Sequence, residues 1–239
     1  ISSITWGKSI EEIQDYAFYG SDMSSITIPS TVKKIGNNAF ACNEFLKEVK
    51  FNEGLTYLSG FNKCDNLASI NIPSTVEVIG NDAFSVCKAI QGELKLPAGL
   101  KSIYSGAFYE CTGITGTLVI PDNTVEIYNH AFYNNSITSL KLGKSVKTIE
   151  NYTFYGCTAL SGELYLPESI QTIGSQAFYN TGISGKLTLP KSLTRLGENA
   201  FQNCANLTSV HQKSVLGTSY SCSNNGYFAG CPNITEVTF

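Results

Sequence analysis

The feature that most constrains this chain is an Ala-Phe dipeptide that returns at a nearly constant interval. It occurs at Ala17-Phe18, Ala39-Phe40, Ala83-Phe84, Ala107-Phe108, Ala131-Phe132, Ala177-Phe178 and Ala200-Phe201. Three further copies keep the Phe without the preceding Ala, at Phe61, Phe154 and Phe228. The ten Phe positions are separated by 21 to 27 residues. A fixed period of this length predicts a solenoid, in which each unit contacts only its neighbours.

The rest of the repeat stays in step with the Phe. In a clean copy, the alternating segment Ile70-Asn71-Ile72 predicts a short strand, and Pro73 ends it because proline has no N–H for a ladder. A second aliphatic segment and the next Ala-Phe follow. Four repeats carry an extra residue and a glycine before the strand, which we expect to absorb a local bulge; these are Gly92, Gly116, Gly162 and Gly185.

Stacking these units places the alternating segments side by side as a parallel sheet on one face. We expect the Phe and the aliphatic residues of each repeat to point inward and to stack on the equivalent residues of the next repeat. The opposite side is expected to hold turns, 3₁₀ segments or a second narrow row of strands, with little helix. Residues 1–239 are expected to form one domain, excised from a longer chain, because no polar cap and no signal peptide opens the sequence.

Charge and hydropathy exclude several classes of partner. Charged residues make up 15% of the chain and the net charge is −3, so no electrostatic footprint for nucleic acid is present. No apolar stretch approaches the roughly 20 residues that a membrane-spanning helix requires. We therefore expect no nucleic-acid binding and no membrane insertion.

Cysteine occupies a position of the repeat rather than a metal motif. Six cysteines lie three residues after the repeat Phe, where other repeats have Asn43, Asn135 and Thr181. Such small polar side chains can bond to backbone in a turn, so we interpret the row as structural. No zinc spacing is present. Cys222 lies in an insertion, and a Cys222–Cys231 disulfide is the open alternative.

Residues for catalysis are scarce. The chain has two histidines; we interpret His130 as a solvated turn residue and His211 as an outward strand residue. The acidic pair Glu11-Glu12 is interpreted as solvated charge. No nucleophile stands beside a base, so we predict a protein that is not an enzyme and has no catalytic residue, cofactor site or metal site.

Two outward rows are candidate binding faces. The outward strand positions are mostly polar, and Val119 and Tyr165 are their apolar exceptions. The second row is the residue after each Phe, which is Tyr in four consecutive repeats: Tyr109, Tyr133, Tyr155 and Tyr179. Tyrosine is favoured in binding sites because it offers rigid amphipathic area. The alternative is that these rings stack on one another and shield the turn.

The unit Cys-x-x-Leu-x-x-Ile-x-Ile-Pro-x-x-Val-x-x-Ile-Gly-x-x-Ala-Phe resembles the BspA-like, or treponemal-type, leucine-rich repeat over nearly the whole chain. The resemblance implies a leucine-rich repeat solenoid of about ten repeats and no shared catalytic residues or cofactor. It also implies a secreted or cell-surface bacterial protein associated with adhesion. The expected function is therefore a non-catalytic extracellular interaction module that binds a host or neighbouring-cell protein or glycan. The alternative is a structural spacer of a surface protein with no ligand of its own.

We expect the domain to be a monomer. A strand at the exposed end of the array offers an unpaired edge, so end-to-end pairing of two copies is the alternative.

Overall fold

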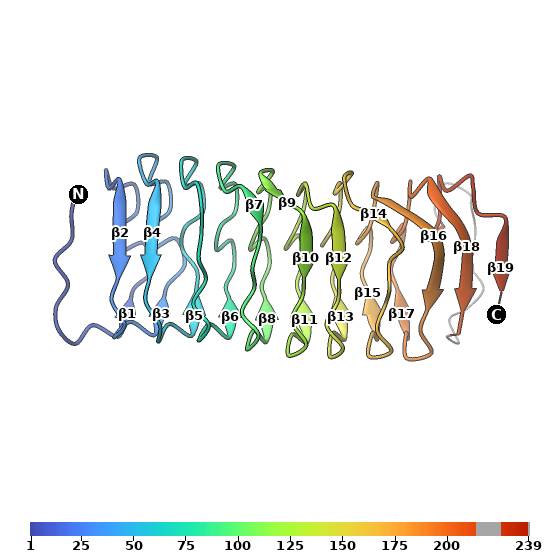
Figure 1. Ribbon diagram of the computed structural model, residues 1–239, viewed down its shortest axis with the longest axis horizontal. Helices are drawn as coiled ribbons and strands as arrows, with labels where there is room; N and C mark the ends of the chain where they lie inside the picture. The colour runs from blue at the N-terminus through green and yellow to red at the C-terminus, as the bar shows by residue number, and fades with distance from the viewer. Residues whose placement is uncertain (214–225, 239) are drawn as a thin grey trace.

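The chain forms an elongated solenoid whose two termini lie at opposite ends (Figure 1). The computed structural model describes residues 1–213 and 226–238. Two rows of strands run side by side along the rod, one pair to most coils (Figure 1). Neither described segment contains an α-helix or a 3₁₀ helix. The predicted solenoid architecture is confirmed.

The first row contains the alternating segments that precede proline, and it is discontinuous. Its parallel sheets have two strands each at β2–β4, β7–β9 and β10–β12, and four strands in the order β14-β16-β18-β19. The strands are β2 (Ser25–Ile28), β4 (Glu48–Phe51), β7 (Gly92–Glu93), β9 (Ile114–Thr115), β10 (Thr117–Val119), β12 (Ser139–Lys141), β14 (Ser161–Gly162), β16 (Gly182–Leu189), β18 (Asn206–Gln212) and β19 (Glu236–Thr238). Residues 70–72, a predicted strand, form none.

The second row is the continuous one. Nine strands of two residues each form one parallel sheet, in the order β1-β3-β5-β6-β8-β11-β13-β15-β17. They are β1 (Glu12–Ile13), β3 (Lys34–Ile35), β5 (Tyr57–Leu58), β6 (Val78–Ile79), β8 (Ser102–Ile103), β11 (Glu126–Ile127), β13 (Thr148–Ile149), β15 (Thr172–Ile173) and β17 (Arg195–Leu196). In each, the second residue is a buried Ile or Leu. The second narrow strand row was one of three predicted possibilities, and it carries the longest sheet.

The extra glycines adopt the backbone that a bulge requires. Gly92, Gly116, Gly162 and Gly185 have φ values of 84°, 76°, 82° and 72°, in the left-handed region where a side chain is disfavoured. Between β16 and β18 the register shifts at Gly185/Lys186. The predicted bulge is confirmed at that position.

The core is organised around a stack of ten Phe rings, here called the Phe column. Neighbouring rings are nearly parallel, with centroids 5.0 to 5.7 Å apart. Nine of the rings are buried, and Phe18, in the first coil, is partly exposed. The column consists of Phe18, Phe40, Phe61, Phe84, Phe108, Phe132, Phe154, Phe178, Phe201 and Phe228.

The turn around each Phe has an unusual backbone. The residues two before and two after the Phe are left-handed in most coils, as His130 (φ 58°) and Asn134 (φ 53°) are around Phe132. Fourteen left-handed residues of the described segments are not glycine. A non-glycine residue pays roughly 1–2 kcal/mol for this conformation, so the tight packing of the coils must hold it in place.

The cysteine row is structural, as predicted. In six coils the buried thiol donates to the carbonyl of the Phe in the preceding coil, as Cys111 Sγ does to Phe84 O at 2.9 Å. Asn135 Nδ2 makes the same bond to Phe108 O at 2.7 Å. Cys42 is an addition that the spacing did not predict, because it lies outside this row. Cys222 lies outside the described residues, so its pairing with Cys231 stays a prediction.

Candidate binding surfaces

The four tyrosines after the repeat Phe form a second aromatic stack, here called the tyrosine ladder. Tyr109 and Tyr133 have centroids 4.8 Å apart, Tyr133 and Tyr155 4.7 Å, and Tyr155 and Tyr179 4.5 Å. The rings are within 16° of parallel. Each side chain is half-buried. Each tyrosine of the ladder directly follows a Phe of the Phe column in the sequence, so the two stacks run through the same coils.

Stacking determines which part of the ladder a ligand can touch. Tyr133 and Tyr155 have a ring on both faces, so only their edges and hydroxyls remain available. Burial is the main cause that raises the pKa of the Tyr109 and Tyr155 hydroxyls, so both stay protonated at neutral pH. The predicted stacking alternative describes the geometry, and a role of the ring edges in binding stays a prediction.

His130 joins the aromatic cluster. It lies in a turn, as expected, but its ring is half-buried and stacks on Tyr152 at 4.8 Å and 12°. Its ring also tilts toward Tyr133, with centroids 5.7 Å apart. Burial lowers its pKa, which favours the neutral imidazole. The prediction of a solvated side chain is therefore wrong. Tyr152 occupies the same turn position in the next coil, so its ring covers the imidazole of His130.

The ladder stops abruptly at Tyr109. The equivalent residue of the preceding coil is Ser85, whose side chain is too short to stack on the ring. A hollow of about 350 Å³ opens there, here called the end hollow, lined by Asp82, Ser85, Ser105, Gly106, Tyr109 and His130. Glycine at position 106 keeps it open, because a Cβ on its left-handed backbone (φ 65°) would overlap Asp82 Oδ1.

The coil before the end hollow is shortened. Leu58 and Ile79 pair in the continuous sheet, yet two residues lie between Leu58 and Phe61 while four lie between Ile79 and Phe84. The missing two residues include the counterpart of Asp82. The Asp82 carboxylate is therefore open to solvent on one side and desolvated on the other, and that burial raises its pKa.

Val119 and Tyr165 lie on the discontinuous strand row. Both are exposed, at 48% and 75% of their surface. The Tyr165 hydroxyl donates to Glu163 Oε2 at 2.5 Å, which ties the ring to its own strand. The structure thus does not bring these two residues together with the tyrosine ladder, which follows the turn at the Phe. They form a separate candidate surface.

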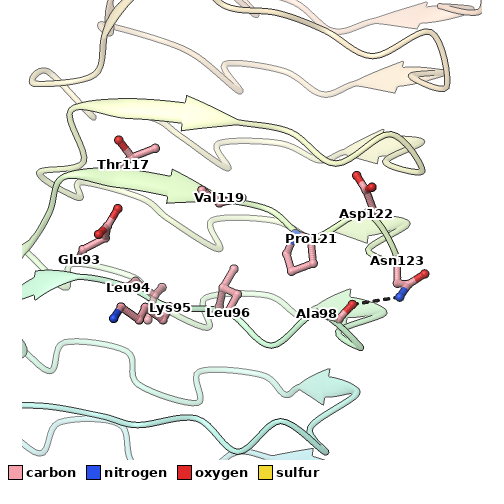
Figure 2. A pocket seen from close by; sticks show the side chains of 10 residues that line it. All are labelled: Glu93, Leu94, Lys95, Leu96, Ala98, Thr117, Val119, Pro121, Asp122 and Asn123. Atoms are coloured by element: carbon pink, nitrogen blue, oxygen red, sulfur yellow. Dashed lines mark hydrogen bonds between the residues drawn. The ribbon is translucent and has the colours of Figure 1, made fainter.

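Val119 lines a hollow of that row, with a volume of about 520 Å³. Figure 2 shows it between two successive coils, with Leu94 and Leu96 on one coil and Val119 and Pro121 on the next. The hollow exists because β10 pairs with β12 on its far side, whereas residues 94–96 on its near side form no strand. Asn123 Nδ2 bridges the two coils at the end of the hollow, donating to Ala98 O at 3.0 Å (Figure 2).

The other residues considered for chemistry have structural partners. His211 Nδ1 lies 2.6 Å from Thr238 Oγ1, which joins β18 to β19. Glu12 pairs with Lys34 Nζ at 2.6 Å across neighbouring coils, in a solvated position as expected. No three His, Cys, Asp or Glu side chains within residues 1–213 and 226–238 are grouped so as to hold a metal ion. The same residues include no helix long and apolar enough to span a bilayer.

Several residues of these surfaces escaped the sequence interpretation. One missed position lies two residues before the Phe and holds Asp82, Gly106 and Tyr152. Another lies two residues after the Phe: Cys42 occupies it and donates to the Tyr19 hydroxyl at 3.3 Å. Asn203 does the same to Tyr179 at 3.1 Å. Reading these two positions as columns, as was done for the residue after the Phe, would have found them.

A family profile described as the BspA type leucine rich repeat region matches the chain in six copies, over residues 1–91, 91–208 and 125–239. No curated protein matches the chain. Among solved structures, a leucine-rich repeat protein from Bacteroides ovatus ATCC 8483 is similar, with a TM-score of 0.72 and 25% identity over 95% of this chain and 63% of that one.

Two further structures share the fold. The pneumococcal vaccine antigen PcpA has a TM-score of 0.53 at 21% identity, covering 85% of this chain and 54% of that one. The T. pallidum leucine-rich repeat protein has a TM-score of 0.51 at 25% identity, covering 71% of this chain and 69% of that one. The chain thus spans less than two thirds of the B. ovatus and pneumococcal proteins.

Proposed function

The chain belongs to the BspA-type leucine-rich repeat family, and from that premise we propose that it is a non-catalytic interaction module of a bacterial cell surface. Its ligand is a protein or glycan of a host or of a neighbouring cell. The binding surface is the tyrosine ladder with the turn residues beside it. The pneumococcal vaccine antigen PcpA shares this fold, which is consistent with the surface location.

The observation that carries this proposal is the confinement of the ladder to part of the rod. The Phe column runs through all ten repeats, as a requirement of the fold must. Tyrosine follows the Phe in only five, and four of these are consecutive: Tyr109, Tyr133, Tyr155 and Tyr179. The other five repeats have Ala41, Asn62, Ser85, Gln202 and Ala229 at this position, and the Phe column is not disturbed there. A feature that the fold does not require, and that presents rigid amphipathic area, is typical of a binding surface.

The test is a binding screen of the purified domain against immobilised host matrix proteins and glycans. A variant with Tyr109, Tyr133, Tyr155 and Tyr179 changed to Ser is screened beside it. The matched control changes three tyrosines of the continuous-sheet side, Tyr57, Tyr104 and Tyr128, to Ser. A ligand that binds the domain and the control but not the ladder variant supports the proposal, provided that all three give the same circular dichroism spectrum.

A structural spacer is the second candidate, and one observation favours it. The nine-stranded sheet and the Phe column extend along the rod without a break, as a rigid stalk requires. If no ligand in the screen distinguishes the ladder variant from the control, and cells displaying the ladder variant adhere as well as those displaying the original, the spacer replaces the binding module.

A further inference from the structure

The end hollow has the shape of a missing rung. Each ring of the tyrosine ladder stacks on the next coil at 4.5 to 4.8 Å. Tyr109 stacks on Tyr133, and its opposite side faces the hollow beside Ser85. A planar group placed there would continue the stack by one rung.

The hollow also carries a carboxylate that lacks a cationic partner. Four ion pairs occur in the described segments, and Asp82 belongs to none of them. His130 is the one group whose charge acts to lower the pKa of Asp82, and burial lowers the pKa of His130 itself, so the imidazole is largely neutral at pH 7. The negative charge of Glu110 acts on Tyr109 from the next residue. The local charge is therefore negative, and a positive ligand complements it.

Shape and charge together select among ligands. A guanidinium group is planar, stacks on aromatic faces and pairs with a carboxylate through two parallel hydrogen bonds. An ammonium group would gain the charge and a cation–π contact but not the stack. A pyranose would cover the ring and donate hydroxyl hydrogen bonds to Asp82, but it would leave the negative charge of the carboxylate unneutralised. The volume of about 350 Å³ is small and suits one side chain rather than a chain of sugars.

We propose that the end hollow binds an arginine side chain of a partner protein, with the guanidinium stacked on Tyr109 and paired with the Asp82 carboxylate. Ser85 and Ser105 lie at the rim, where their hydroxyls can meet the peptide that carries the arginine. This inference rests on the proposed function, since it assigns the partner chemistry of one end of the tyrosine ladder.

The test is an NMR titration of the ¹⁵N-labelled domain with three peptides: acetyl-Gly-Gly-Arg-Gly-Gly-amide and its versions with Lys or Gln in the centre. The Arg peptide should produce saturable shifts at the amides of Asp82, Ser85 and Gly106. The Lys peptide should bind more weakly and the Gln peptide should leave these amides unshifted. Equal shifts with the Arg and Gln peptides would overturn the proposal.

Two variants locate the contacts. Asp82→Asn keeps the shape of the hollow and removes its charge, so it should weaken the Arg peptide about tenfold or more. Ser85→Tyr fills the vacant rung with a ring of the protein's own and should abolish binding while the domain stays folded. Glu163→Gln, on the distant strand row, is the matched control for charge and should change nothing. An Asp82→Asn variant that binds the Arg peptide normally contradicts the assignment.

Failure of this inference and failure of the proposed function give different results. If a ligand from the screen depends on the four tyrosines but the Arg peptide produces no shifts, only the arginine site is wrong. If methyl glucoside or cellobiose shifts the same amides and the Arg peptide does not, the hollow is a glycan subsite. If the Arg peptide binds at Asp82 and no ligand depends on the rest of the ladder, the site stands and the proposed function falls.

Discussion

Two aromatic stacks run next to each other in this molecule, and they differ in what they tolerate. The Phe column is buried and passes through ten coils, whereas the tyrosine ladder is half-buried and passes through four. Both follow the same coil spacing, since each ring sits at a fixed position of the repeat. The comparison teaches that the repeat imposes stacking on any aromatic residue placed at either position. Burial decides whether the stack is required for folding or is free to vary with the ligand.

The largest expected difference comes from removing one ring of the Phe column. Phe108→Ala leaves a cavity between two rings in a buried row and should reduce the free energy of unfolding by about 3–5 kcal/mol. Equilibrium denaturation in urea measures the loss. Because the Phe column is the common core, a loss below about 1 kcal/mol would show that neighbouring coils can collapse into the gap, and the distinction between the stacks would weaken.

A ring removed from the tyrosine ladder should cost less, and the cost should depend on its place. Tyr133→Ala removes two stacked contacts, which should contribute about 1–3 kcal/mol beyond the burial of the ring, at 0.5–1.5 kcal/mol for each aromatic pair. Tyr109→Ala removes one stacked contact and should cost about half as much. The same urea denaturation compares them. Equal losses for the two variants would mean that stacking contributes little and that burial of each ring alone sets the cost.

A smaller effect is expected from the backbone conformation of the turn that both stacks share, as distinct from the packing of their rings. Val86 and Gly20 occupy the left-handed position two residues after the Phe, with φ values of 62° and 60°. Val86→Gly should relieve strain and raise stability by up to about 1 kcal/mol, while Gly20→Ala, where no atom lies in the way, should lower it by about 1 kcal/mol. Thermal denaturation detects both. A destabilised Val86→Gly variant would show that the valine methyls contribute more than the strain costs.

The smallest expected effect is a pH dependence of the stability, which arises from His130 beside the tyrosine ladder. Burial lowers the pKa of His130 below its ordinary 6.5, so the unfolded chain binds more protons than the folded chain near that pH. Stability should therefore fall as the pH drops through and below about 6.5. His130→Gln should flatten this part of the profile, measured by urea denaturation at pH 5 to 8. An unchanged slope in the variant would place the proton uptake elsewhere.

The repeat period alone predicted the column, the coil count and the cysteine row, because each of these recurs at a fixed position. The period could not predict which of the two strand rows forms the longer sheet. Strand pairing depends on whether neighbouring coils stay in register over several residues, and the extra residue shifts that register, as it does between Gly185 and Lys186. The two-residue strands ending at Ile79 and Ile103 keep their register because no length variation falls within them. Their pairing therefore continues from coil to coil.

The candidate site was predicted in part. The tyrosine ladder follows from reading one column of residues, and its stacking was one of the two predicted outcomes. Asp82 and Gly106 were missed, since the end hollow depends on a deletion in the preceding coil and on the absence of a side chain. Both lie two residues before the repeat Phe, a position that the sequence interpretation did not read as a column. His130 was judged from its immediate neighbours, although its main contact, Tyr152, lies 22 residues away.

Four buried thiols give the rod an internal probe of its local unfolding. Burial raises the pKa of Cys111 and Cys157 to about 12 and also raises the pKa of Cys87 and Cys204, so thiolate, the reactive form, is almost absent at these positions at neutral pH. Alkylation of each of these four cysteines therefore requires the coil that holds it to unfold. Because they lie in four different coils, mass spectrometry after timed alkylation would report the stability of those coils one by one without any introduced label.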